Sequence, residues 1–143
     1  ILTECVDKFH PHLNERGLHL KLEPSTGPLT ATGDETLLKI IFNNLLDNAV
    51  SYSPPGSEIK IHGGKSNGHV EIRIANPSDD LPDNLERLFE PLFRRDGSRS
   101  DAGSHLGIGL NLCQEAADAI EATLRAHRPE QGGIEFILKL PAC

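Results

Sequence analysis

Tryptophan and methionine are absent from the sequence, and the larger aromatic side chains are limited to five Phe and one Tyr. A core without these residues must be built mainly from Leu, Ile, Val and Ala, which suits helices packed on a sheet. The chain has 143 residues, 37% of them hydrophobic, and this is enough for one domain around one core. Neither a repeat nor a shift in composition indicates two domains, so we expect residues 1–143 to form a single domain.

Three further features are scarce or missing, and each excludes a class of protein. The formal net charge is −7, and the nearest approach to a basic stretch is Arg94, Arg95 and Arg99, so no binding to nucleic acid is expected. The three cysteines are too few and too widely spaced for a zinc site or a disulfide framework, which predicts reduced thiols in a cytosolic compartment. Neither a run of about 18 apolar residues nor a signal peptide is present. Because the chain starts at Ile1, we expect a fragment, with any membrane anchor or sensor outside it.

Hydrophobic periodicity and turn residues predict elements of mixed type. In chain order, we expect a helix from Ile1 that ends before Gly17, strands at 18–22 and 29–32, a helix at 35–53 capped by Asp34, strands at 58–62 and 69–75 joined by a hairpin loop at 63–68, a short helix at 82–89, a polar loop at 94–105, a helix from Gly107 to Ile120, and strands at 122–127 and 133–140. This order does not fit a parallel βαβ repeat. The predicted fold class is α+β, a two-layer sandwich with helices on one face of a mixed, mostly antiparallel sheet.

Two asparagines interrupt the apolar run of the helix predicted at 35–53. Asn44 and Asn48 are four residues and about 40° apart around a helix axis, so they present two amides to one side. A buried amide without a partner costs about 1–3 kcal/mol, and amide oxygens are suitable ligands for magnesium. The pair indicates either a metal and phosphate site or hydrogen bonds to neighbouring backbone on a half-exposed face.

Two other segments are candidates for ligand binding. The segment GSHLGIGL at 103–110 places glycines at a helix entrance, where phosphate can approach backbone amides, although a plain tight turn also explains them. At 74–95 a strand ends on Asn76, a proline-containing loop follows, and Phe89 and Phe93 lie one turn apart if helical. The two phenylalanines are also explained as core anchors under a loop.

The order of these pieces resembles the catalytic ATP-binding domain of two-component sensor histidine kinases. These belong to the GHKL ATPase superfamily, which includes type II topoisomerases and mismatch-repair proteins and shares the Bergerat ATP-binding fold. The resemblance covers almost the whole chain and rests on five motifs, namely NNLLDNAVSYSPPGS as the asparagine box, NPSDDLP at the adenine-loop position, LFEPLFR as the phenylalanine box, HLGIGLNLC as the glycine-rich lid hinge and GGIEFILKLP as the closing strand. Five motifs in the family's order argue against chance similarity.

The resemblance implies ATP and Mg²⁺ as cofactors and assigns roles to individual residues. It makes Asn48 the magnesium ligand and places Asn44 beside the same phosphate and metal cluster, so that these two form the implied catalytic centre. Tyr52 would line the nucleotide pocket, and Asn76 stands where most relatives have an aspartate that accepts a hydrogen bond from adenine. Its Asn-Pro start is similar to the heavy-metal sensor branch. The remaining implied nucleotide-binding residues are Phe89 and Phe93 of the phenylalanine box, Arg94, which with Arg95 or Arg99 would reach phosphate oxygens, and Gly107, Ile108, Gly109 and Leu110 of the lid hinge.

The sequence departs from the family pattern at several positions. Ser51 stands where many members have a lysine or arginine that contacts phosphate, and the loop after Asn76 has none of the usual glycines. His105 replaces a common glycine, and Ile134 replaces a frequent threonine. Ser51 and the glycine-free loop motivate an alternative, a degenerate regulatory module that acts through protein partners with weak or no nucleotide binding.

The reaction implied by the resemblance is phosphoryl transfer and not hydrolysis. In the hydrolysing relatives a glutamate four residues before the metal-binding asparagine activates water, and here that residue is Asn44, which cannot act as a base. The resemblance implies that the domain donates the γ-phosphoryl group of ATP to a histidine on a dimerisation domain of the same protein, for relay to a response regulator. It also implies the cytoplasmic part of an inner-membrane sensor, monomeric in isolation and homodimeric in the parent. A serine kinase of the anti-sigma type shares the fold, but the phenylalanine box and the Asn-Pro loop favour a histidine kinase.

Overall fold

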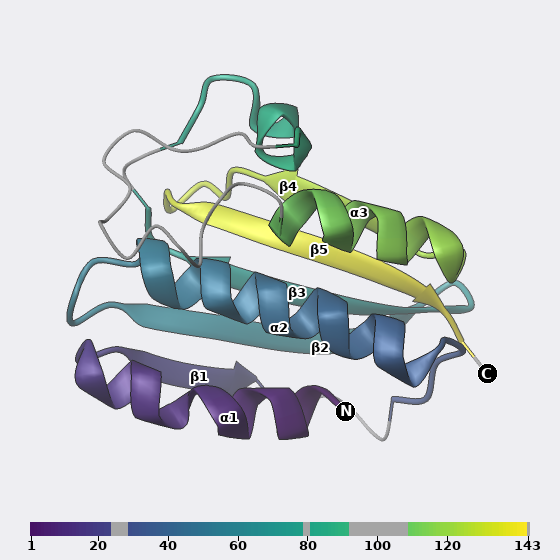
Figure 1. Cartoon of the computed structure of the whole chain (residues 1–143), viewed down its shortest axis with the longest axis horizontal. Coiled ribbons are helices and arrows are strands. Elements are labelled where there is room, and N and C mark those ends of the chain that lie inside the picture. The colour runs from purple at the N-terminus through teal and green to yellow at the C-terminus, as the bar shows by residue number, and fades with distance from the viewer. Residues whose placement is uncertain (24–28, 79–80, 92–108, 143) are drawn as a thin grey trace.

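A five-stranded mixed sheet with three α-helices on one face makes up the structure, a computed structural model that describes residues 1–23, 29–78, 81–91 and 109–142 (Figure 1). The elements are α1 (Leu2–Glu15), β1 (His19–Glu23), α2 (Glu35–Tyr52), β2 (Glu58–Ser66), β3 (His69–Asn76), the 3₁₀ helix η1 (Leu85–Phe89), α3 (Gly109–Ala119), β4 (Thr123–His127) and β5 (Ile134–Pro141). The strand order is β1-β2-β3-β5-β4, with β1 parallel to β2 and the other neighbours antiparallel. This arrangement confirms the predicted α+β sandwich.

Helix α2 carries the two asparagines of the predicted site. Asp34 caps its first turn, because its Oδ1 accepts a hydrogen bond from the Leu37 amide at 3.0 Å. The helix ends after Tyr52, where Ser53 is extended and Pro54 follows. One face of the helix is buried against the sheet and its neighbours through Leu38, Ile41, Phe42, Leu45, Leu46, Ala49 and Val50. The burial of these side chains fixes which face of α2 turns outward.

The end of α1 is tied to the end of α2. Gly17, with φ of +66°, and Leu18 close a Schellman motif, in which the Leu18 amide donates to the Leu13 carbonyl at 2.8 Å. Leu13 and Leu18 are both buried, which supplies the hydrophobic contact of that motif. The neighbouring Arg16 donates from Nη2 to the carbonyl oxygen of Ser53 at 2.8 Å. The two helices are therefore held together at one end of the molecule.

Helix α3 ends in the same motif but without a glycine. Glu121 adopts φ of +59°, and the Ala122 amide donates to the Ala117 carbonyl at 2.8 Å. For a residue with a β-carbon this left-handed conformation costs about 1 kcal/mol or more. Glu121 is exposed, so packing of its side chain does not offset the strain.

The loop predicted between the two central strands is shorter than expected. Residues 63–66 of the predicted hairpin loop 63–68 belong to β2, and the turn consists of Asn67 and Gly68, with φ of +48° and +79°. These two positive φ values match a two-residue hairpin turn, for which Asn-Gly is strongly preferred. Gly63 lies in the strand, and a β-carbon there would lie 2.7 Å from Cδ1 of Leu29, so the leucine packs where a side chain of residue 63 would begin. Close packing, and not a turn, accounts for this glycine.

Other predicted boundaries shift by smaller amounts. The strand expected at 29–32 is an isolated bridge between Ala31 and Ala142. The short helix expected at 82–89 is the 3₁₀ helix η1, which begins at Leu85. The helix expected from Gly107 is described from Gly109, since 92–108 lie outside the described residues, as does the predicted loop at 94–105.

The two faces of the sheet have opposite character. The face under the helices is apolar, with buried side chains from each central strand, among them Ile59, Ile61, Ile72, Ile74, Phe136 and Leu138. On the opposite face Arg73 bridges neighbouring strands, with Nε 2.5 Å from Glu71 and Nη1 3.0 Å from Glu135. The hydrogen bond and charge of Glu71 raise the pKa of Arg73. Lys139 and His127 extend these pairs at 3.8 Å from Glu71 and 3.5 Å from Glu135.

The described cysteines are free thiols inside the core. Cys5 and Cys113 are 1% and 0% exposed, and the Sγ of Cys113 lies 3.7 Å from the carbonyl oxygen of Ile41 on α2. Burial raises the pKa of both thiols, that of Cys113 to about 12. Both are consequently protonated and unreactive at neutral pH. Among the described helices, none has the length and apolarity that crossing a membrane requires.

Candidate functional site

The two asparagines of α2 lie on a half-buried stripe along the edge of the buried face. Asn44 and Asn48 are both of intermediate exposure, as are Asn43 and Asp47, while the residues between them are buried. The Nδ2 of Asn44 donates to the carbonyl oxygen of Ile40, one turn earlier, at 2.7 Å. This bond agrees with the interpretation in which the asparagines hydrogen-bond to neighbouring backbone. The side-chain oxygen Oδ1 of Asn44 takes no part in it.

That carbonyl oxygen faces the first residue of α3. A β-carbon placed on Gly109 would lie only 2.8 Å from Oδ1 of Asn44. A β-carbon at this position would require the Asn44 amide to shift, so glycine lets the entrance of α3 pack on the asparagine in its present orientation. The sequence assigned these two residues to separate motifs, and the structure brings them into contact.

Asn76 ends β3 at the end of the sheet next to the C-terminus of α2. This follows from the topology, because α2 leads into the start of β2, and that start pairs with the end of β3 through Lys60 and Ala75. Figure 1 shows the start of α3 at the same end. Asn44, Tyr52 and Asn76 therefore come from elements that converge on one end of the helical layer.

The amide of Asn76 is buried and only half satisfied. The side chain is 4% exposed, and its Nδ2 donates to the carbonyl oxygen of Pro77 at 2.8 Å. This bond fixes the orientation of the amide, because the opposite orientation would place two oxygens against each other. Its Oδ1 is buried and has no hydrogen-bond partner among the described residues. Such an acceptor costs about 1–3 kcal/mol and suits a ligand that brings a donor, as the amino group of adenine does.

Gly133 is a contributor that the sequence prediction missed. It adopts φ of +81°, and a β-carbon there would lie 2.4 Å from the backbone oxygen of Asn76 and 3.0 Å from Cα of Pro77. The loop before β5 therefore packs directly on the backbone that carries the Asn76 amide. The Gly-Gly pair before the closing strand was the feature in the sequence that pointed to such a close approach.

The phenylalanine box is tied to the glycine-containing helix by a second missed residue. Phe89 is 7% exposed and packs edge-on against Phe136 of β5, with ring centroids 6.1 Å apart and planes at 84°. Its carbonyl oxygen accepts a hydrogen bond from Nδ2 of Asn111 at 3.3 Å. Phe89 is thus a core anchor, as one interpretation predicted, and Asn111 connects η1 to the first turn of α3. A polar residue inside the apolar run after Gly109 was the clue to Asn111.

The remaining predicted site residues divide into described and undescribed ones. Tyr52 is the last residue of α2 and is half-buried, and Leu110 is 9% exposed in the first turn of α3. The other four, Phe93, Arg94, Gly107 and Ile108, lie outside the described residues.

The predicted site residues on α2, Asn44 and Asn48, carry amide oxygens. Within the described ranges, no group of three or more His, Cys, Asp and Glu side chains is placed to hold a metal ion. Magnesium, however, is usually bound through one or two protein oxygens together with phosphates and water. The half-buried amide of Asn48 fits that mode of binding, in which the nucleotide supplies most of the ligands.

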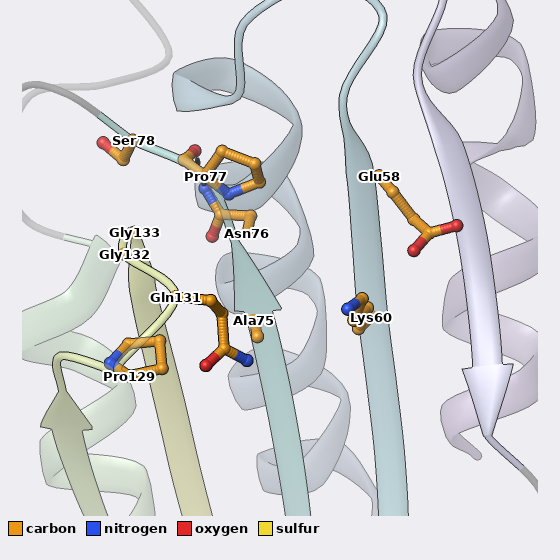
Figure 2. A pocket seen from close by; sticks show the side chains of 10 residues that line it. All are labelled: Glu58, Lys60, Ala75, Asn76, Pro77, Ser78, Pro129, Gln131, Gly132 and Gly133. Atoms are coloured by element: carbon orange, nitrogen blue, oxygen red, sulfur yellow. Dashed lines mark hydrogen bonds between the residues drawn. The ribbon is translucent and has the colours of Figure 1, made fainter.

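A pocket of about 300 Å³ lies on the other face of the sheet (Figure 2). It is lined by Glu58 and Lys60 of β2, residues 75–78, Pro129 and residues 131–133. Lys60 and Ala75 alternate along their strands with the buried residues that face the helices, and Figure 2 shows α2 behind the sheet on the far side from them. The pocket is therefore separate from the asparagines of α2, and Asn76 is one of the residues that line it.

Comparison with known proteins identifies the family. A family profile described as "Histidine kinase-, DNA gyrase B-, and HSP90-like ATPase" matches residues 33–143. The signal transduction histidine-protein kinase BaeS of Escherichia coli is 31% identical over 134 residues, covering 93% of this chain and 28% of BaeS. The probable sensor protein PcoS of Escherichia coli is 34% identical over 140 residues, covering 97% of this chain and 29% of PcoS. The chain thus spans less than a third of the length of these relatives.

Solved structures match the fold over nearly the whole chain. The catalytic domain of histidine kinase ThkA superposes with a TM-score of 0.84 at 22% identity, covering 99% of this chain and 90% of that one. Full-length ShkA in complex with AMPPNP gives a TM-score of 0.80 at 20% identity, covering 99% and 29%. ThkA in complex with the response regulator protein TrrA gives 0.80 at 21% identity, covering 99% and 39%.

Proposed function

The chain belongs to the family of histidine kinase-, DNA gyrase B- and HSP90-like ATPases, and from this membership we propose that it is the catalytic ATP-binding domain of a sensor histidine kinase. In this proposal residues 1–143 form a single domain that binds ATP with Mg²⁺. The domain donates the γ-phosphoryl group to a histidine on a dimerisation domain, which lies elsewhere in the full-length protein. ATP binding by the family and the AMPPNP complex of ShkA support the choice of nucleotide.

The observation that carries the proposal is the unsatisfied oxygen of Asn76. Its Oδ1 is buried and lacks a partner among the described residues, while its Nδ2 is held by the Pro77 carbonyl. The residue can therefore accept a hydrogen bond from a ligand but has little capacity to donate one. A purine with an amino group at the 6-position provides the matching donor, and a 6-oxo purine does not.

The phosphate end of the proposed site involves the two asparagines of α2. Asn48 would hold Mg²⁺ through its amide oxygen, and Asn44 would lie beside the phosphates. When bound, the metal neutralises charge on the phosphate oxygens. The proposed nucleotide-binding set also includes the described residues Tyr52, Phe89, Gly109 and Leu110. Its remaining members lie outside the described residues and are Phe93, Arg94, Gly107 and Ile108.

Transfer is favoured over hydrolysis by the chemistry of Asn44. Its amide cannot take a proton from water, and its Nδ2 is already engaged by the Ile40 carbonyl at 2.7 Å. Phosphoryl transfer requires mainly positioning and neutralisation of charge, so a domain without a general base can hold ATP until a nucleophile arrives. The proposed nucleophile is the histidine of the dimerisation domain.

The proposed partners follow from the relatives. BaeS is named a signal transduction histidine-protein kinase, and ThkA has been solved with a response regulator. We expect the phosphoryl group to pass from the histidine to a cognate response regulator. We also expect the parent protein to be a homodimeric membrane sensor, with this domain on the cytoplasmic side and monomeric when isolated.

The test is calorimetric titration of the purified chain with AMPPNP in the presence and absence of Mg²⁺. We expect binding that strengthens with Mg²⁺, and we expect Asn48→Ala to remove the Mg²⁺-dependent part. Asn14→Ala, which removes an exposed amide from α1, is the matched control and should bind as the wild type does. Absence of binding at millimolar AMPPNP would reject the proposal in favour of a degenerate regulatory module.

A further inference from the structure

The pocket on the open face of the sheet has the features of a second ligand site. Its volume of about 300 Å³ is at the lower end of the range for small-molecule sites. Ala75 lies between two longer side chains across the strands, because its register partners are Lys60 and Glu135. The small side chain leaves a hollow, and Pro77, Pro129 and the loop at 131–133 enclose it (Figure 2).

One lysine lines this hollow and a second lies beside it, although the chain as a whole carries a net charge of −7. Lys60 and Lys21 are register partners on β2 and β1, and neither has an ion pair among the described residues. Like charges placed directly opposite each other on neighbouring strands are destabilising, and an anion bound beside them would reduce this repulsion. Of these two lysines only Lys60 lines the hollow, and the carboxylate of Glu58 lies beside its positive charge. Glu135 does not offset this charge, because it is paired with Arg73 at 3.0 Å.

We propose that this pocket binds a small organic carboxylate, anchored by Lys60, and that occupancy of the pocket strengthens nucleotide binding. The two proline rings and Ala75 offer apolar surface for the body of the ligand, and Gln131 offers an amide for a further hydrogen bond. Glu58 lies two residues from Lys60 on the same face of β2. Its carboxylate disfavours a dianion such as phosphate, so the site suits a monoanion.

The connection to the nucleotide site runs through the segment from Asn76 to Ser78. These residues form one wall of the pocket, and the Pro77 carbonyl accepts the hydrogen bond that orients the Asn76 amide. On the other side, Gly133 packs against the Asn76 backbone so tightly that a β-carbon would lie 2.4 Å from its oxygen. A ligand wedged between this loop and Pro77 would brace the amide in its acceptor orientation. This part of the inference rests on the proposed nucleotide site, whereas carboxylate binding does not.

The first experiment titrates the ¹⁵N-labelled, nucleotide-free chain with benzoate as the probe. We expect saturable shifts of the amides of Ala75, Gln131 and Gly132 at millimolar benzoate. Lys60→Gln should weaken binding about tenfold or more, while Lys65→Gln, which removes an exposed lysine at the far end of β2, should leave it unchanged. Absent or unsaturable shifts, or equal effects of the two substitutions, would overturn the site. Inorganic phosphate binding more tightly than benzoate would overturn the monoanion assignment.

The second experiment measures the coupling with ADP. We expect saturating ADP to tighten benzoate binding about fivefold or more, and benzoate to tighten ADP binding by the same factor, since linkage is reciprocal. An unchanged or weakened benzoate affinity in the presence of bound ADP would overturn the coupling. If ADP does not bind at all, the proposed function fails, but the benzoate titration of the nucleotide-free chain still decides the pocket.

Discussion

Replacement of Asn76 by leucine should have opposite effects on two properties of the protein. It should remove the cost in stability of the unsatisfied oxygen, and it should also remove the group proposed to bind the nucleotide. Leucine branches at the same carbon as asparagine and has no polar atom in its side chain. In the wild type, the buried Oδ1 has no partner among the described residues, and Nδ2 donates to Pro77 at 2.8 Å. The substitution removes both groups at once.

The two changes act in opposite directions on stability. Removal of a buried acceptor without a partner returns about 1–3 kcal/mol, and loss of the bond to Pro77 costs about 1 kcal/mol. The net effect on the free energy of unfolding lies between about 0 and about +2 kcal/mol. For a chain of this length that corresponds to a melting temperature that is unchanged or raised by up to about 6–8 °C.

The effect on nucleotide affinity should be a loss. The amino group of adenine would enter the site without an acceptor, at a cost of about 1–3 kcal/mol, which is about 5- to 150-fold in the dissociation constant. The assay pairs thermal unfolding of the nucleotide-free protein with calorimetric titration by AMPPNP. Asn43→Leu is the matched control, because its Oδ1 is also buried without a described partner but is not assigned to the site. It should raise stability and leave affinity unchanged.

Two results would refute this reasoning. If Asn76→Leu lowers the melting temperature, the bond to Pro77 contributes more to stability than the unsatisfied oxygen costs, and the amide is primarily structural. If the Asn76→Leu variant binds AMPPNP with the same affinity as the wild type, Asn76 does not accept a hydrogen bond from the adenine amino group, whatever the stability of the variant.

Three further predictions concern packing and protonation. Gly109→Ala should destabilise the protein by about 1 kcal/mol, because its β-carbon would lie 2.8 Å from Oδ1 of Asn44. In an Asn44→Ala background this loss of stability should vanish. A double-mutant cycle of urea unfolding would measure the difference. Glu121→Gly should stabilise by about 0.5–1 kcal/mol, since glycine adopts φ of +59° without strain, and an unchanged urea midpoint would contradict this. Burial raises the pKa of the Cys113 thiol from 9.0 to about 12. The contribution of this thiol to the free energy of unfolding should therefore be fully present below pH 9 and should decline by up to about 1.4 kcal/mol per pH unit as the pH rises from 9 to 12. Urea unfolding across this range should show a steeper decline for the wild type than for Cys113→Ala, and parallel declines would contradict the assignment.

The sequence predicted elements well where local physics decides them. The cap at Asp34 and the apolar stripe of α2 follow from residues three and four apart, and the helix formed as expected. At 63–68 the same local reasoning was wrong, because two adjacent glycines resemble a loop. Gly63 lies in the strand, and Leu29 packs closely on it. Leu29 precedes the whole of α2 in the chain, so this packing leaves no trace in the sequence next to Gly63.

The candidate site was predictable in its residues but not in its contacts. The amides of α2 and the glycines before α3 are visible in the sequence, whereas the contact between Asn44 and Gly109 depends on how two helices pack. The bond from Asn111 to Phe89 and the approach of Gly133 to Asn76 likewise join distant segments. The pocket on the open face was not anticipated, because three segments far apart in the chain form its walls.

The tight turn at Asn67 and Gly68 has a consequence for how the sheet assembles in time. Ser66 and His69, which flank the turn, pair directly, so β2 and β3 can form by closing a very short loop. Pairing of β1 with β2 must instead close a loop that contains all of α2, and pairing of β5 with β3 must close one that contains η1, α3 and β4. Because the entropy of loop closure grows with separation, we expect the β2–β3 hairpin to act as the template on which β5 and β1 later dock. Pulsed hydrogen exchange during refolding should then protect the amide of Arg73, which faces β2 because the hydrogen-bonded pairs alternate from Ser66 and His69, before the amide of His19, which donates to the Ser57 carbonyl beside β2. The reverse order would show that the hairpin does not form first.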